Sequence, residues 1–239
     1  MSVDDPTAGP TTATEPVRRR DLAVARSLDS ARLRSEGRVQ RFLDAGFELL
    51  GRAESGKEFT VQEVVDRSGQ SLRSFYQYFA GKHELLLALF DEAILSTADR
   101  LEEQITRQST PFERLHCFVV EYYRMCLPAP KGRLSKNNPT PVMAEFCHQL
   151  LTAHQTEASR AFVPLVTLLE KVLDEARRAG DIRSGLDHAE VAGVILSTIM
   201  FNAAYAQTIS GNEMAPDGDH AAAQLWEFLS GGIVIRPPV

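Results

Sequence analysis

The sequence is poor in cysteine, with only Cys117, Cys126 and Cys147 in 239 residues. An odd number of cysteines without C-x-x-C spacing is neither a disulfide framework nor a typical zinc site, and it fits a reducing compartment. The chain also lacks G-x-S-x-G, Walker and dinucleotide-binding fingerprints. We therefore expect no metal, no cofactor and no enzymatic activity, and we expect a cytoplasmic location.

A long apolar run is also missing. Residues 191–212 carry no charge, but polar side chains interrupt them at Ser197, Thr198, Asn202, Gln207, Thr208, Ser210 and Asn212. A membrane span needs roughly twenty predominantly apolar residues, and Lys or Arg clusters usually flank it. We expect a buried or interfacial helix here and no membrane partner. Residues 1–16, rich in Thr, Pro, Ala and Asp, have no apolar core, so we expect no ordinary secretory signal in them.

Charge is distributed unevenly along the chain. Residues 16–82 hold 13 Lys and Arg against 9 Asp and Glu, whereas residues 83–239 hold 13 against 20. The total formal charge is −6. A basic segment on an acidic protein predicts an anionic partner near the N-terminus, although a solvated surface would look the same.

The remaining pattern is helical throughout. Apolar residues recur every three or four positions from Arg38 to Leu50, and they continue for roughly 24 residues from Lys82. Further helices are expected over 112–127, 142–153, 162–179, 190–209 and 220–229, with a Pro- and Asn-containing loop at 127–141. No segment alternates like a strand, and no internal repeat is visible. The sequence predicts an all-α fold.

Two short helices near the N-terminus form a separate motif. Thr60 is placed to cap a helix over 61–68, Gly69 to end it in a left-handed conformation, and Ser71 to cap a helix over 72–79. This order of elements is a helix-turn-helix, in which the second helix presents its N-terminal side chains to DNA bases. The motif alone is only moderately specific, because other helical bundles also contain it.

The whole string from Thr60 to Leu86 resembles the DNA-binding signature of the TetR family. The residues that match are Thr60, Val61, Val64, Gly69, Ser71, Phe75, Tyr76, Tyr78, Phe79, Lys82 and Leu85. The chain departs from the pattern at Val65, Ser68, Gln70 and Leu72. The resemblance implies a flexible arginine-rich arm over 1–35, a three-helix DNA-binding domain over 36–84, and a larger helical ligand-binding and dimerisation domain over 85–239.

Candidate DNA contacts follow from the motif and the resemblance. Arg73 is the candidate for reading a base, since Arg donates twice to guanine. The resemblance assigns Lys82 to a phosphate, which would offset the cost of a cation in the first turn of a helix. The resemblance gives Thr60 and Tyr76 contacts with the DNA backbone. The alternatives are a plain helix cap for Thr60 and a half-buried core aromatic for Tyr76. The complete set is Arg38, Thr60, Gln70, Ser71, Leu72, Arg73, Tyr76, Gln77, Tyr78 and Lys82. Arginines 18 to 34 either touch DNA or form a solvated tail.

The resemblance also implies a ligand and a partner subunit. Pocket candidates, for each of which core packing is the alternative, are Phe118, Tyr122, Met125, Phe146, His148, Phe162, Leu165, Leu169, Met200 and Tyr205. Dimer candidates are Val194, Thr198, Phe201, Tyr205, Leu225, Trp226 and Leu229, with Phe228 beside them. The nearest approach to a metal site is Cys147, His148 and His154, whose spacing suits surface or pocket residues instead.

These expectations combine into one function. The sequence predicts a ligand-responsive regulator, taken as a repressor, that binds near-palindromic double-stranded operator DNA as a homodimer and is released by a small hydrophobic effector. The alternative is a helical ligand-binding or adaptor protein with weakened DNA binding. Gln70 and Leu72 are the features that favour the alternative.

Overall fold

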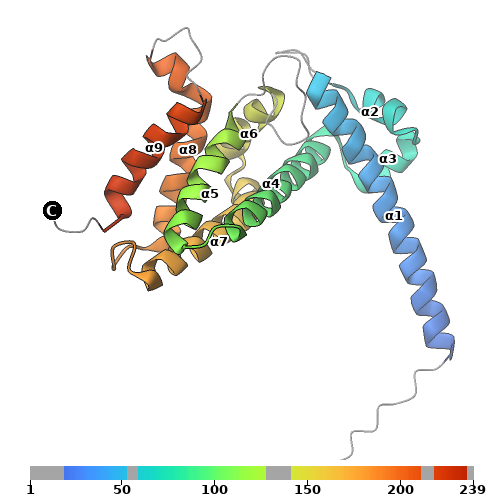
Figure 1. Ribbon diagram of the computed structural model, residues 1–239. Helices are drawn as coiled ribbons and strands as arrows, with labels where there is room; N and C mark the ends of the chain where they lie inside the picture. Colours follow the sequence, from blue (N-terminus) through green and yellow to red (C-terminus); the bar gives the residue numbers. More distant parts are fainter. Residues whose placement is uncertain (1–18, 53–58, 128–140, 211–217, 236–239) are drawn as a thin grey trace, which may run out of the picture. The chain divides into compact units, whose positions relative to one another are not determined.

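The computed structural model describes residues 19–52, 59–127, 141–210 and 218–235 (Figure 1). The helices within these residues are α1 (Arg19–Arg52), α2 (Val61–Ser68), α3 (Leu72–Tyr78), α4 (Lys82–Thr106), α5 (Pro111–Cys126), α6 (Pro141–Ala153), α7 (Gln155–Ala179), α8 (His188–Ser210) and α9 (Gly218–Ile233). The described residues contain no β-strand, and an isolated antiparallel bridge joins Ile182 to Val234. The expected all-α fold is confirmed.

The chain divides into two compact units, residues 1–40 and 41–239. The described part of the first unit is the N-terminal part of α1. The second unit holds the rest of α1 and all the other described helices.

Helix α1 begins much earlier than the sequence indicated, at Arg19 rather than at Arg38. Residues 19–36 contain no proline or glycine and are largely good helix formers. Arg32 also donates to the Glu36 carboxylate at 2.6 Å, an i,i+4 pair that supports an exposed helix. The described part of the arginine-rich arm is therefore helical. Helix α7 likewise begins at Gln155, before the expected Phe162, and carries Pro164 inside it.

An aromatic cluster forms the core beneath the helix-turn-helix. The Phe42 ring of α1 is fully buried, and it meets the ring of Phe75 edge-on at 5.5 Å and the ring of Phe79 at 6.1 Å. Val64 and Val65 add the buried side of α2. Edge-to-face aromatic pairs contribute beyond the area they bury, so this cluster fixes α3 against α1.

The larger part of the second unit is built around α4 and α5. Helix α4 packs against α5 and α7, and α5 packs against α7, α8 and α9 (Figure 1). Side chains such as Leu101, Leu115 and Leu169 are fully buried between them. The buried Tyr123 hydroxyl donates to Asn202 Oδ1 at 3.2 Å, which gives one polar residue of the uncharged helix α8 a partner on α5.

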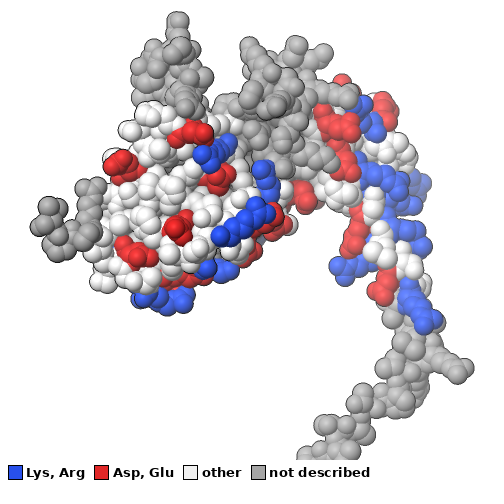
Figure 2. All heavy atoms as spheres, in the orientation of Figure 1, with Lys and Arg blue, Asp and Glu red and all other residues white. Residues whose placement is uncertain are grey.

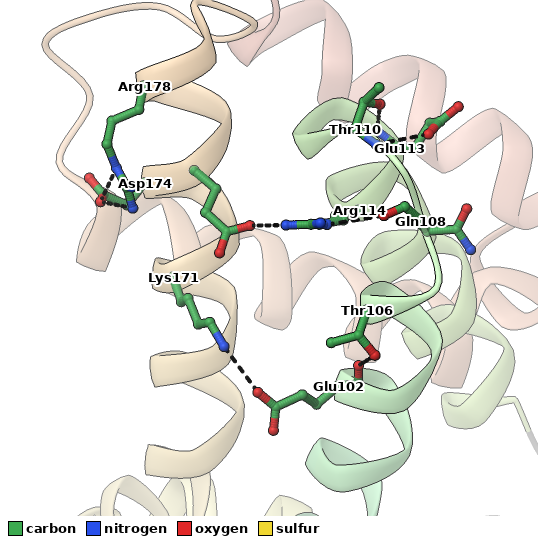
Figure 3. Close-up of polar contacts among 10 residues, drawn as sticks. Glu102, Thr106, Gln108, Thr110, Glu113, Arg114, Lys171, Asp174 and Arg178 are labelled. Atoms are coloured by element: carbon green, nitrogen blue, oxygen red, sulfur yellow. Dashed lines mark hydrogen bonds and ion pairs between the residues drawn. The ribbon is translucent and has the colours of Figure 1, made fainter.

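Two ion pairs join α7 to the C-terminal part of α4 and to the start of α5 (Figure 3). The Lys171 ammonium lies 3.0 Å from the Glu102 carboxylate. Arg114 at the start of α5 donates to the Gln108 carbonyl at 3.2 Å and to Glu175 at 2.8 Å, so one guanidinium bridges the α4–α5 turn and α7. The charged side chains of these pairs are partly exposed to solvent. Each pair therefore orients the helices more than it adds to the free energy of unfolding.

In the part of the chain that the structure describes, no helix combines sufficient length with sufficient apolar character to cross a membrane, and this includes the described residues of α8.

Candidate DNA-binding site

Helix α2 is fixed at its N-terminus by a reciprocal capping box. The Glu63 amide donates to Thr60 Oγ1 at 3.2 Å, and the Thr60 amide donates to the Glu63 carboxylate at 2.7 Å. Two amides that lack partners within the helix are satisfied in this way, and the first turn gains a favourable negative charge. Thr60 thus has a structural role as a helix cap, and its exposed position leaves its backbone at the protein surface.

The turn between α2 and α3 depends on a single glycine. Gly69 has φ 65° and ψ 24°, the left-handed region in which a side chain would be strained. Its amide and that of Gln70 both point back to the Val65 carbonyl, and the Gln70 contact measures 3.3 Å. The expected left-handed end of the helix is confirmed, and it sets the direction in which α3 leaves the turn.

Helix α3 buries one side and exposes the other. Ser71 caps it by accepting from the Ser74 amide at 3.1 Å, and Phe75 is fully buried. The opposite side is exposed and consists of Leu72, Arg73, Tyr76 and Gln77. These four positions share one face because they are spaced i, i+1, i+4 and i+5. Leu72 is 42% exposed and Tyr76 is 56% exposed, so both present apolar surface on this face.

Three of the predicted DNA contacts, Gln70, Tyr76 and Tyr78, also lie against other parts of the protein. The Gln70 side-chain oxygen accepts from Ser74 Oγ at 3.4 Å, so this glutamine lies along the first turn of α3. Tyr78 is half-buried at the end of α3. Tyr76 packs edge-on against Phe75 at 5.5 Å, which keeps its ring at the surface beside the core.

Lys82 begins α4, and its ammonium lies over the ring of Phe59, 5.1 Å from the centroid. A cation at this helix end opposes the macrodipole, and the negative face of the ring offsets part of that cost. Glu84 in the same turn accepts from the Ala80 amide, which lies just before the helix, and Gly81 at the N-cap position has no side chain to cap it. The lysine is held at the beginning of α4 by this packing.

The helix-turn-helix itself carries little net charge. Residues 60–82 contain the cations Arg67, Arg73 and Lys82 against the carboxylates Glu63 and Asp66. Arg67 is paired with Glu48 of α1 at 2.8 Å. Arg73 is therefore the principal exposed cation of α3, and Arg38, the remaining predicted contact, is exposed on the first unit.

Residues 42–89 match the family model described as bacterial regulatory proteins, tetR family. The matched segment runs from the buried Phe42 through both helices of the motif into α4. Over this segment the chain matches the TetR family.

The chain is also similar to individual members over most of its length. It is 23% identical over 163 residues to a fatty acid metabolism regulator protein of Bacillus subtilis (strain 168), covering 68% of this chain and 79% of the relative. The fold matches FadR from Bacillus subtilis, solved in complex with stearoyl-CoA, with TM-score 0.57, 18% identity, and coverage of 81% and 98%. Reduced Escherichia coli NemR gives TM-score 0.61, 14% identity, and coverage of 85% and 100%. The two Bacillus subtilis relatives are regulators, and the likeness to the solved structures establishes the fold.

Most of the predicted pocket residues are core residues. Phe118, Tyr122, Met125, Phe146, Leu165 and Leu169 are buried, and Phe162 and Met200 are half-buried. His148 and Tyr205 lie at the surface. Burial raises the pKa of Tyr122 well above its usual range, and burial likewise raises the pKa of Cys126 to about 12 and of Cys147 to about 11. In the described residues, no three His, Cys, Asp or Glu side chains come together as a metal site.

Phe90 of α4 is a residue that the sequence did not single out. Its ring lies 6.2 Å from Phe146 of α6 and 5.6 Å from Phe162 of α7. Phe146 also meets the His83 ring at 5.7 Å, so α6 contacts α4 at two levels. The apolar period of α4 includes Phe90, but only the three-dimensional arrangement reveals the aromatic cluster that it completes.

The predicted dimer residues divide into two groups. Leu225 and Leu229 are buried within the chain, and Trp226 packs edge-on against Phe112 at 5.7 Å and His116 at 5.0 Å. These three side chains join α9 to α5. Val194 and Phe201 on α8 are 60% and 58% exposed, and Phe228 on α9 is 76% exposed. Thr198 is half-buried and Tyr205 is exposed on the same side of α8, since positions 194, 198, 201 and 205 share one face.

Proposed function

We propose that this chain is a ligand-responsive transcriptional repressor that binds a near-palindromic operator as a homodimer. The observation that carries the proposal is the exposed face of α3, where Leu72, Arg73 and Tyr76 project from a helix that Phe75 fixes to the core. A rigidly held short helix with an arginine and apolar groups on its outer side suits reading base edges and thymine methyl groups in the major groove.

The proposed dimer suits this role because it would present two α3 helices to DNA. The exposed apolar line of Val194, Phe201 and Tyr205 on α8, together with Phe228 on α9, is the surface we assign to the partner subunit. A two-fold arrangement would place the recognition helices about 34 Å apart, one turn of DNA, and would thereby require a near-palindrome.

The proposed dimer surface can be tested by placing one charged side chain in it. Phe201→Glu should convert the protein to the 26.5 kDa monomer in light scattering. Val163→Glu is the matched control, because Val163 of α7 is also exposed but lies outside the proposed surface. A dimer that survives Phe201→Glu and Phe228→Glu together would contradict this assignment of the surface.

The effector that we propose is a small hydrophobic molecule, and a fatty acyl compound is the first to test. The buried apolar and aromatic side chains of α5, α6 and α7 are the kind that line such a site. A relative with the same fold was solved in complex with stearoyl-CoA. Entry of a ligand between α6 and α7 would displace Phe146 or Phe162, and both touch Phe90 of α4.

Helix α4 then provides a route to the DNA-binding helices. Leu89, next to Phe90, is buried, and it packs so closely against Gly46 of α1 that an added Cβ there would lie 2.7 Å from Leu89 Cδ1. The aromatic cluster and the α1 contact therefore occupy adjacent residues of one helix. A ligand that prefers a different position of α4 shifts the population toward a dimer with altered spacing.

Mapping of bound DNA across the genome is the primary test, followed by binding to the selected duplex. Arg73→Ala should cost on the order of 1–3 kcal/mol and relax the preference at one or two base positions. Lys82→Ala should weaken binding to all DNA sequences equally, and it should lower the slope of log K against log salt by roughly one per half-site. A protein that shifts no DNA at low salt would instead be a ligand-binding or adaptor protein.

Reciprocity tests the ligand response. A coupling of about 1–3 kcal/mol would weaken DNA binding roughly 5- to 150-fold, and DNA must then weaken ligand binding by the same factor. Affinity of an acyl-CoA for the free protein and for the protein–DNA complex would be measured by calorimetry. Equal affinities would exclude that compound as the allosteric effector. Insertion of two glycines after Leu89 should preserve DNA binding yet blunt the response.

A further inference from the structure

The N-terminal part of α1 carries a basic face that the helix-turn-helix does not include. Arg26, Arg34 and Arg38 are all exposed. At 3.6 residues per turn they fall within a sector of about 120°, and they extend along about 18 Å of helix. Among the described residues, Arg26 and Arg34 have no carboxylate at ion-pair distance.

Among the side chains that the structure describes, the carboxylates of the same segment lie outside this sector. Asp29 and Glu36 fall together on another side of the helix, and Glu36 is occupied by Arg32 at 2.6 Å. Figure 2 shows the separation, with most of the blue side chains of this helix along one edge and the red ones along the other. The segment is therefore a charge-segregated helix rather than one with alternating charges.

The residues between the arginines are small. Ser27, Ser30 and Gly37 fall within the same sector, all are exposed, and the space beside Gly37 is open. A flat face of small and hydroxyl-bearing residues lets an extended anion approach the helix backbone closely. Large apolar anchors, which a protein partner would use, are absent from this face in the described residues.

We propose that the face of Arg26, Arg34 and Arg38 is a second DNA-binding surface, which contacts phosphates and not bases. The inference rests on the proposed function, because it assigns additional contacts to the same complex. Residues 60–82 have three cations against two carboxylates, and residues 83–239 repel DNA with 20 carboxylates against 13 cations. Proteins that bind DNA tightly neutralise about six to ten phosphates. The arginine face supplies cations that the motif lacks.

The test compares two variants of this helix that remove charge from different sides. Arg34→Ala removes a cation from the proposed face, and Arg32→Ala removes one from the opposite side as the matched control. The probes are the operator selected by genome mapping and a short duplex of unrelated sequence, each titrated at several salt concentrations. Circular dichroism checks that both variants keep the helix.

We expect Arg34→Ala to weaken binding to both duplexes by the same factor, and Arg32→Ala to leave the affinity for both unchanged. The Arg26→Ala/Arg34→Ala variant removes four contacts per dimer, so it should lower the slope of log K against log salt by about 3.6. The affinity lost between about 50 and 200 mM salt should then shrink by about a hundredfold.

Three outcomes would overturn the inference. If the double variant and Arg32→Ala behave alike while the wild type binds its operator, the arginine face does not touch DNA and the proposed function stands. If the wild type binds neither duplex at low salt, both proposals fail. If the double variant changes the mass of the particle in light scattering, the face joins copies of the chain instead.

Discussion

The close approach of α1 to α4 makes Gly46 a position where one methyl group should be costly. Gly46 is buried in α1, and an added Cβ would lie 2.7 Å from Leu89 Cδ1 and 3.2 Å from Cδ2. Real Cβ atoms do not approach carbon so closely, and Leu89 is fully buried with little room to move. Gly46→Ala therefore forces Leu89 or α1 to shift.

Two effects of opposite sign determine the size of the change. Overpacking in a well-packed core costs about 1–3 kcal/mol. Replacing glycine by alanine inside a helix gains about 1 kcal/mol. Gly37→Ala is the matched control, since Gly37 lies in the same helix with nothing within 4 Å of an added Cβ. Gly37→Ala should stabilise the protein, and Gly46→Ala should be about 1–3 kcal/mol less stable than that control.

The measurement is urea unfolding at fixed protein concentration. Leu89→Val completes a double-mutant cycle, because valine lacks the δ carbons that the new methyl group meets. Gly46→Ala should cost less in the Leu89→Val background, and a coupling above about 0.5 kcal/mol identifies the contact. Equal stabilisation by Gly46→Ala and Gly37→Ala, with an additive cycle, would refute the close α1–α4 contact.

Three further predictions concern caps, acidic groups and thiols. Thr60→Ala should lower the free energy of unfolding by about 1 kcal/mol in urea titrations, because the capping box is lost. Hydrogen bonds from Arg177 and then Arg178 hold the pKa of Asp174 below its usual value. The stability difference between wild type and Asp174→Asn should therefore be fully present above the unfolded pKa of about 3.9 and be lost as the pH falls through the lower folded-state pKa, in unfolding at several pH values. Iodoacetamide at pH 8 should alkylate Cys126 and Cys147 slowly in the folded protein and rapidly in urea, because burial raises their pKa to about 12 and 11. Equal rates in both states would contradict that burial.

The helices around the turn were predictable because local residues determine their ends. Thr60, Gly69 and Ser71 each act on amides or carbonyls only a few residues away, and both helices begin where these residues indicated. Helix α4 likewise begins at Lys82 as expected. The start of α1 was not predictable from apolar periodicity, because an exposed helix has no core to face and its propensity is spread over many residues.

The regulatory part was less predictable because its contacts are distant in sequence. The apolar residues of α9 lie on more than one side, so the sequence could not tell that Leu225 and Leu229 face the core while Phe228 faces outward. The cluster of Phe90, Phe146 and Phe162 needs three helices to meet. Such choices depend on tertiary packing, for which spacing along one helix carries no information.

The two ends of α4 differ in a way that would let a small tilt of the helix move its N-terminal end. Near its C-terminal end, Glu102 is paired with Lys171 of α7, whereas its first residue, Lys82, lies at the DNA-binding helices. Twenty residues of helix separate them, about 30 Å. A tilt of about five degrees about the paired end would move Lys82 by about 2.6 Å, judged from that length. Charge-assisted hydrogen bonds form over a range of only a few tenths of an ångström, so this displacement is enough to break a phosphate contact. Under the proposed function, a ligand that acts at Phe90, between these ends, would therefore release DNA without unfolding any helix.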